Sequence, residues 1–256
     1  MTTAPSALPV PLSAADPEAQ IAALVLRHAR ANGPVMALVT RLGGRFERQL
    51  ALIPPSLKAR IGQVTEKALA TAWGVAGARA LPKGGKHLSM AAAVVSGAAG
   101  GVGGLATSVA ELPVSVTVIL HAIRQQAIAA GYDPDTPRIR AECLQVFAAG
   151  SPLAADDGID TAFVSARLTL TGPALQKLIS VVAPKLAAVM TQKLAAQAVP
   201  VLGAITGAAL NAAFLRYYSE IAAIRFALLR LADQHGDVRI LQAFRDATQP
   251  APLNRA

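Results

Sequence analysis

Glu111 is the residue in this sequence best placed to do chemistry, because it ends a run from His87 to Ala110 that carries no formal charge. A carboxylate beside a histidine can act as a general acid–base pair, so Glu111 with a histidine in a helical pocket would suit an enzyme. His121 and Arg124 follow about three helical turns later, too far to pair with Glu111 along one helix. The neighbouring sequence therefore offers Glu111 no obvious partner.

Two interpretations of Glu111 remain open. In the simpler one, which we favour, Glu111 caps a new helix that starts at Leu112-Pro113, because proline suits the first turn and a carboxylate is favoured at a helix N-terminus. In the other, its side chain lies among the glycine-bearing helices and must be paired or protonated, because an unpaired buried carboxylate costs several kcal/mol. The possible functional polar residues are Glu111, His121 and Asn211, the last being an amide inside a second uncharged run.

Other chemistry finds little support in the sequence. The histidines form no HxxxH or HExxH pair, so we predict no metal site. The sequence contains neither a GxSxG nucleophile elbow nor a P-loop. The run GAAGGVGG lies in an apolar stretch and does not follow a strand, so its glycines indicate packing and not a dinucleotide site. We expect no cofactor, and we favour a non-enzymatic role without excluding an enzyme.

Closely spaced glycines mark the two uncharged runs, His87–Ala110 and 194–215. Their spacing is the small-xxx-small pattern that lets two helices approach closely. We therefore predict that the two glycine-bearing helices pack on each other as a glycine zipper. The helix-packing residues of this prediction are Gly97, Gly100, Gly101, Gly104, Gly203 and Gly207.

Both runs are about 20 residues long or slightly longer, which is enough to cross a bilayer as a helix. Their alanine and glycine content makes insertion marginal, and Gln197 and Asn211 need hydrogen-bond partners that lipid cannot supply. We therefore favour burial of the two runs in the centre of a bundle over membrane spanning.

Composition predicts an all-α protein, because 53% of the residues are hydrophobic, only 4% are aromatic, and β-branched alternation is nearly absent. We expect a single multi-helix bundle with two central Gly/Ala-rich apolar helices. Residues 1–14 should form a disordered leader, 15–248 the helical domain and 249–256 a flexible tail. Helical periodicity and breakers predict helices at about 17–31, 34–52, 56–80, the glycine-rich run, 113–130, 138–150, 159–170, 174–198 (one or two, around Pro184), 200–235 and 237–246.

The net charge of +9 lies mostly in the N-terminal half. Arg41, Arg45 and Arg48 share one face of the helix expected at 34–52, which suits a solvated face, the commoner case, or a contact with anionic lipid head groups. Basic residues are not interleaved with aromatic ones, so we expect no nucleic-acid partner. The single cysteine fits a reducing cytoplasm, and the N-terminus has no signal-peptide pattern. We expect a cytoplasmic protein, with peripheral attachment to the inner face of the membrane as an option.

Four stretches of the chain resemble the EcsC protein family, a bacterial family named for the third gene of an ABC-transporter operon. They are the glycine-rich run followed by Glu111-Leu112-Pro113, AECLQVFA at 141–148, QKLAAQAVPVLGAITGAALNAAFL at 192–215, and RFALLRLADQHG at 225–236. The resemblance covers roughly residues 55–246. It implies a helical protein linked to transporters and membranes, with no established catalytic residues. We therefore expect a non-enzymatic partner of an anionic membrane surface or a membrane protein complex; the alternative is an enzyme that uses Glu111 and a histidine.

Overall fold

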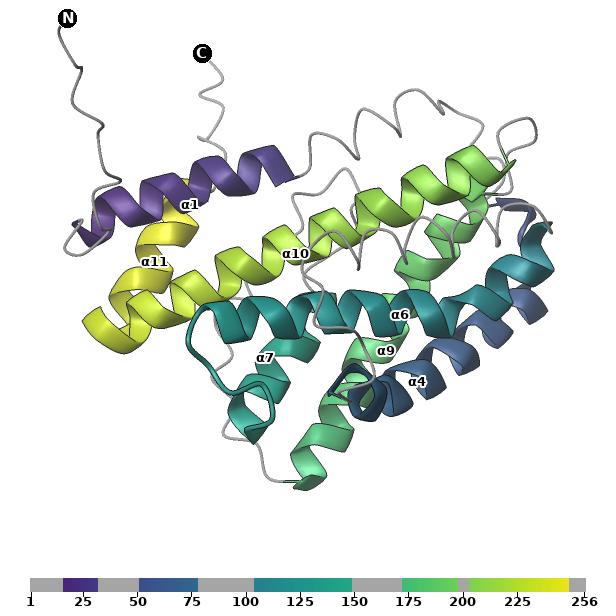
Figure 1. Ribbon diagram of the computed structural model, residues 1–256, viewed down its shortest axis with the longest axis horizontal. Helices are drawn as coiled ribbons and strands as arrows, with labels where there is room; N and C mark the ends of the chain where they lie inside the picture. Colours follow the sequence, from purple (N-terminus) through teal and green to yellow (C-terminus); the bar gives the residue numbers. More distant parts are fainter. Residues whose placement is uncertain (1–15, 32–50, 78–103, 149–171, 198–202, 249–256) are drawn as a thin grey trace, which may run out of the picture.

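The computed structural model describes residues 16–31, 51–77, 104–148, 172–197 and 203–248. All regular elements in these ranges are α-helices, which confirms the all-α bundle expected from composition (Figure 1). The helices are α1 (Pro17–Ala31), α4 (Pro55–Gly77), α6 (Gly104–Ala129), α7 (Pro137–Ala148), α9 (Gly172–Gln197), α10 (Gly203–His235) and α11 (Asp237–Thr248).

Helices α6 and α10 pack side by side through the middle of the molecule (Figure 1). On one side α4 packs against α6 and α9, while α7 lies against α9, α6 and α10. On the other side α1 and α11 pack against each other and against α10. The 33 residues of α10 make it the longest helix described, at about 50 Å. It therefore contacts both groups of helices.

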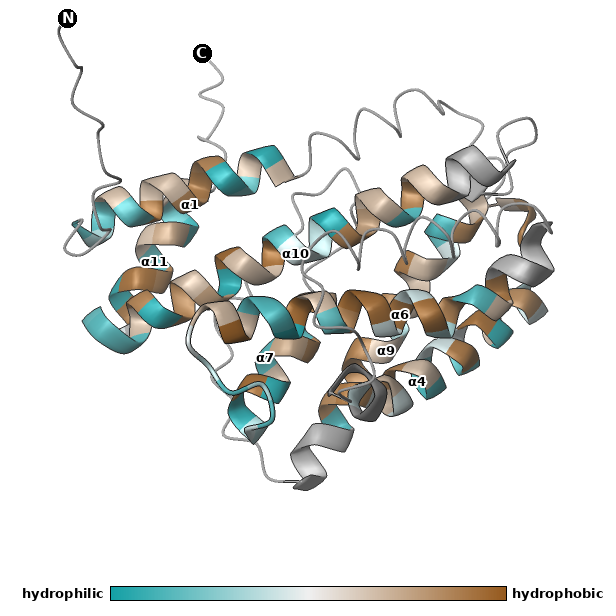
Figure 2. Cartoon of the chain, in the orientation of Figure 1, coloured by the Kyte–Doolittle hydropathy of each residue, from teal (hydrophilic) through white to brown (hydrophobic). Residues whose placement is uncertain are grey.

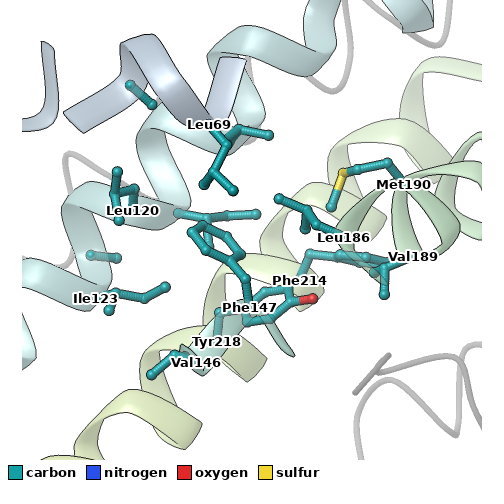
Figure 3. Packing of buried hydrophobic residues seen from close by; sticks show 14 of the residues in the cluster. Leu69, Leu120, Ile123, Val146, Phe147, Leu186, Val189, Met190, Phe214 and Tyr218 are labelled. Carbon is teal, nitrogen blue, oxygen red and sulfur yellow. The ribbon is translucent and has the colours of Figure 1, made fainter. Parts of the chain in front are cut away.

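The main hydrophobic core lies where α4, α6, α7, α9 and α10 meet. Its members on α6 recur at helical spacing, so that Leu112, Val116, Ile119 and Ile123 are all buried. Figure 2 shows this apolar stretch along α6, and Figure 3 shows how side chains of α4, α6, α7, α9 and α10 point towards one another. The labelled residues in that view are Leu69, Leu120, Ile123, Val146, Phe147, Leu186, Val189, Met190, Phe214 and Tyr218.

A smaller cluster joins α1 and α11 to the C-terminal part of α10. Its buried members are Ile21, Leu24, Ile224, Leu228, Leu231, Ala232, Ile240 and Phe244. The His28 ring, also buried, meets Phe244 edge-on with 6.4 Å between centroids. These contacts thus hold α1 against α11 and the C-terminal part of α10.

The prolines of two long helices differ from the sequence prediction. We expected a new helix to begin at Leu112-Pro113, but α6 runs through Pro113 without interruption. Pro184, where a break was an option, likewise lies inside α9. Proline removes one intrahelical hydrogen bond and crowds the preceding turn, so each costs about 3 kcal/mol in an isolated helix. Burial of apolar residues on either side of each proline offsets that cost.

Helix ends follow the breakers in the sequence. Gly131 and Gly236 have φ angles of 88° and 93° and terminate α6 and α10, a conformation that glycine adopts without strain. The bounds of α1 agree with the prediction, and those of α4, α7 and α11 agree within three residues. The helix expected at 159–170, nearly all of that at 34–52 and the glycine-rich run before Gly104 lie outside the described residues.

Candidate functional site

Four buried polar side chains from three helices meet around Glu111. Glu111 and Ser115 lie on α6, Lys193 on α9 and Asn211 on α10, and we call this group the Glu111 cluster. Lys193 Nζ lies 3.2 Å from Glu111 Oε2 and donates to Ser115 Oγ at 2.6 Å. Ser115 Oγ and Asn211 Nδ2 both donate to Glu111 Oε1, at 2.5 Å and 2.9 Å. The carboxylate thus receives hydrogen bonds from all three partners.

Continuity of α6 is what brings these groups together. Glu111 and Ser115 are four residues apart, so they lie on one face of the helix, and that face packs against α9 and α10. The capping interpretation of Glu111 was therefore wrong, because no helix begins at Leu112. The second interpretation holds: the carboxylate is buried among helices, and its cation comes from α9, 82 residues along the chain.

Lys193 carries the most deeply buried charge of the cluster, with its side chain only 1% exposed. Burial lowers the pKa of Lys193, while the charge of Glu111 and the hydrogen bond to it act in the opposite direction. The ion pair therefore offsets a large desolvation cost.

The cluster contains groups that could do chemistry. A lysine that hydrogen-bonds a serine hydroxyl is an arrangement that activates nucleophiles in some hydrolases. Here the serine proton points at Glu111 Oε1, and all four side chains are buried, the most exposed being Glu111 at 8%. In this arrangement the groups hydrogen-bond one another and tie α6, α9 and α10 together.

His121 and Arg124 are not part of this cluster. Both lie on α6 further towards its C-terminus, and His121 is about 15 Å from Glu111 along the helix axis. Arg124 instead holds Asp135 through both terminal nitrogens, at 3.0 Å each from Oδ1. The structure thus joins Glu111 with Asn211, and with neither His121 nor Arg124.

A second buried ionic group joins α7 to α10. Arg225 donates to Glu142 Oε2 through Nε at 2.8 Å and through a terminal nitrogen at 2.6 Å. The same terminal nitrogen lies 3.3 Å from Gln145 Oε1. Both charged side chains are at most 5% exposed. The sequence prediction missed this Arg225 cluster, as it missed Lys193 and Ser115.

A signal for the first pair is present in the sequence. Glu111 is the one charged residue between Lys86 and Arg124, and Lys193 is the one charged residue between Lys185 and Arg216. Two isolated charges of opposite sign, each inside an apolar helix, must form an ion pair or remain unpaired in the core. The Arg225 pair has no comparable signal, because charged residues are common around it.

Exposed basic residues outnumber acidic ones on α4 and α9. They are Lys58, Arg60, Lys67, Lys177 and Lys185, and the only acidic residue of these two helices is Glu66. On α9, Lys177, Val181 and Lys185 recur every four residues, and Val181 is 54% exposed. The outer surface of α4 and α9 is therefore basic with an exposed apolar residue.

Several residues singled out from the sequence cannot be placed. Arg41, Arg45, Arg48 and the glycines from Gly97 to Gly101 lie outside the described residues. Gly104, Gly203 and Gly207 lie in the N-terminal turns of α6 and α10, whose side-chain surroundings are not described. The glycine zipper stays a prediction.

Within the described ranges, no group of three or more histidine, cysteine, aspartate or glutamate side chains could hold a metal ion. By length and hydropathy one described helical segment could cross a membrane, Lys177–Ala195, and half of it is buried in the bundle. It contains the buried Lys193, and it largely precedes the second uncharged run of the sequence, with which it shares only its last two residues.

The two ionic clusters connect the stretches on which the family resemblance rests. Glu111 contacts Lys193 and Asn211 of the 192–215 stretch, and Glu142 of the 141–148 stretch contacts Arg225 of the last one. No curated protein and no solved structure matches the chain. The model of the EcsC protein family matches residues 78–231, which is more than half of the sequence. The chain therefore belongs to the EcsC protein family.

Proposed function

We propose that this protein is a non-enzymatic helical protein that attaches to an anionic membrane surface through the outer faces of α4 and α9. The observation that carries the proposal is the charge of these faces, where five exposed basic residues stand against one acidic residue. Each lysine or arginine close to an anionic membrane contributes about 1 kcal/mol to binding. Such a surface should therefore bind an anionic membrane more strongly than an uncharged partner.

The pattern on α9 adds an apolar contribution. Val181 lies between Lys177 and Lys185 on one exposed face, so an apolar side chain can enter the head-group region while both ammonium groups stay at its surface. Leu52, just before α4, is 71% exposed and can act in the same way. This combination suits a protein that lies on a membrane.

The Glu111 cluster supports the non-enzymatic part of the proposal. Its carboxylate, ammonium and hydroxyl groups bond one another in a closed core, so a substrate would have to displace them to react. A membrane protein complex with an acidic surface is the other partner that the same basic faces would suit. Either partner would place the protein on the cytoplasmic side of the membrane, as expected from the sequence.

Vesicle flotation tests the proposal. Wild-type protein should float with vesicles containing phosphatidylglycerol at low salt, and it should be released by high salt because screening weakens exposed charges. Replacing Lys177 and Lys185 by glutamine should weaken binding roughly 30-fold, as expected for two charges of about 1 kcal/mol each.

The matched control removes two charges elsewhere. Arg230 and Arg239 are exposed residues on α10 and α11, so their replacement by glutamine lowers the net charge equally without touching α4 or α9. Equal losses in the two double variants would contradict the assignment to α9. Equal binding of wild-type protein to neutral vesicles would contradict the proposal, and release by detergent alone would indicate insertion.

A further inference from the structure

The indole ring of Trp73 contacts the guanidinium groups of two arginines from other helices. The guanidinium carbons of Arg124 on α6 and Arg140 on α7 both lie 4.6 Å from the centroid of its ring. Cation–π attraction explains why each arginine can rest there. Two positive charges are nevertheless concentrated around one half-buried indole.

One of the two arginines has its acidic partner. Arg124, 5% exposed, donates to both carboxylate oxygens of Asp135 at 3.0–3.2 Å. Its charge is therefore neutralised by a partner whose own side chain is 64% exposed. The negative charge of Asp135 is thus already used in its ion pair with Arg124.

Arg140 has no such partner in the part of the chain that the structure describes. Its Nε atom is buried and has no hydrogen-bond acceptor, and the same is true of Trp73 Nε1. The neighbouring acid Glu142 is bound to Arg225. The Nε–H group of the cationic Arg140 and the indole N–H group of Trp73 are therefore without an acceptor, next to Arg124, which already binds a carboxylate.

We propose that Arg140, Trp73 and Arg124 form a binding site for a phosphate group. Arg140 would donate through its planar fork, which matches the oxygens of phosphate, and the indole N–H of Trp73 would supply a further donor. Arg124 adds positive charge to the site, and its ion pair with Asp135 weakens its attraction for the phosphate. The site uses α4, α6 and α7 and is independent of the proposed membrane attachment through Lys177 and Lys185.

The phosphate could belong to a soluble molecule or to a lipid head group. A soluble phosphate monoester has a higher charge than a phosphodiester lipid and would suit two guanidinium groups better. Inorganic phosphate and glycerol 3-phosphate represent the first source. Phosphatidylglycerol vesicles represent the second.

Trp73 reports directly on this site because it is the only tryptophan of the chain. Its fluorescence should change in a saturable manner as inorganic phosphate is added to the full-length protein at constant ionic strength, and sodium chloride alone should give no such change. Replacing Arg140 by glutamine should raise the half-saturating concentration at least about tenfold, because the main ionic donor is lost.

Arg138 provides the matched control for charge, because it lies on the same helix but pairs with Asp233. Arg138→Gln should leave the phosphate midpoint unchanged. A second pair of variants tests the site in the opposite direction. Asp135→Asn should lower the midpoint by freeing Arg124, whereas Asp233→Asn, which removes the same charge, should not.

Three results would overturn the proposal. They are the absence of a fluorescence change with both the soluble phosphates and the phosphatidylglycerol vesicles, equal effects of Arg140→Gln and Arg138→Gln, and a midpoint that Asp135→Asn leaves unchanged. A response to vesicles without any response to soluble phosphates would assign the site to lipid. A response to soluble phosphate that survives loss of vesicle binding in the Lys177 and Lys185 double variant would separate this site from the proposed function.

Discussion

The ion pair between Lys193 and Glu111 gives the sharpest test of the energetics of this fold. Its Nζ–Oε2 distance is 3.2 Å, and the two side chains are 1% and 7% exposed. At that distance and an effective dielectric constant of about 20, the attraction between the charges is about 5 kcal/mol. Replacing Lys193 by methionine keeps the length of the side chain but leaves the carboxylate without its cation. We expect the free energy of unfolding to fall by about 3–5 kcal/mol.

The complementary variant Glu111→Gln should cost a similar amount, because it strands the ammonium group. A glutamine still offers an oxygen to Asn211 and Ser115, so Glu111→Gln combined with Lys193→Met should recover most of the loss. We expect the double variant to lie within about 2 kcal/mol of wild type, since replacing a whole buried ion pair by neutral groups is often nearly neutral. Denaturant unfolding followed by Trp73 fluorescence and circular dichroism measures all four free energies.

The single variant Glu111→Gln also has an expected pH dependence. Burial lowers the pKa of Lys193, and the loss of Glu111 removes the interaction that opposes this effect. Between the lowered folded pKa and the unfolded value of about 10.5, the unfolded chain binds a proton that the folded chain has released. The stability of this variant should therefore rise with pH in that window, and the rise should begin at a lower pH than in wild type.

The exposed pair of Arg27 and Glu220 is the control for these measurements. Its side chains are 42% and 26% exposed, so Arg27→Met and Glu220→Gln should each cost less than about 1 kcal/mol. If the Lys193 and Glu111 single variants cost no more than this surface pair, or if their costs simply add in the double variant, the cluster does not stabilise the fold in the way argued above.

Two further predictions concern local features of the fold. Gly236→Ala should lower the free energy of unfolding by about 1 kcal/mol or more, because the φ of Gly236 is 93°. Gly62→Ala should raise it by up to about 1 kcal/mol, because Gly62 lies inside helix α4 and an added Cβ would meet no neighbouring atom. Equal effects of the two variants in denaturant titrations would refute this prediction. Cys143, the only cysteine, is fully buried and burial raises its pKa to about 12, so a disulfide reagent at about pH 8 should label it only as fast as the chain opens, and labelling at the rate of a free thiol would contradict its position in the core.

Local signals in the sequence were enough to predict most helices, because apolar periodicity and breakers coincide at their ends. Pro17 and Gly236 mark such ends, and the structure places helix limits there. Pro113 misled the prediction, since its local preference for a first turn was outweighed by packing of the residues on both sides in one continuous helix. Tertiary burial, which single residues do not report, decided this case.

The polar site was harder to predict than the helices. Glu111 and Asn211 stood out because polar groups are rare in their apolar surroundings, but their relation depends on contacts between helices about 100 residues apart. Helical periodicity identifies which face of a helix is buried and does not identify what that face meets. The Trp73 group shows the same limit, because its arginines come from two other helices that sequence spacing does not relate to it.

Helix α10 is anchored at two points along its length. Asn211 bonds Glu111, and Arg225, 14 residues later, bonds Glu142, which places the anchors about 21 Å apart and nearly on one face. A slide of α10 by one turn, about 5.4 Å, would break both contacts at once and leave Glu142 and Arg225 unpaired in the core. The two contacts therefore define the axial alignment of α10 against α6 and α7.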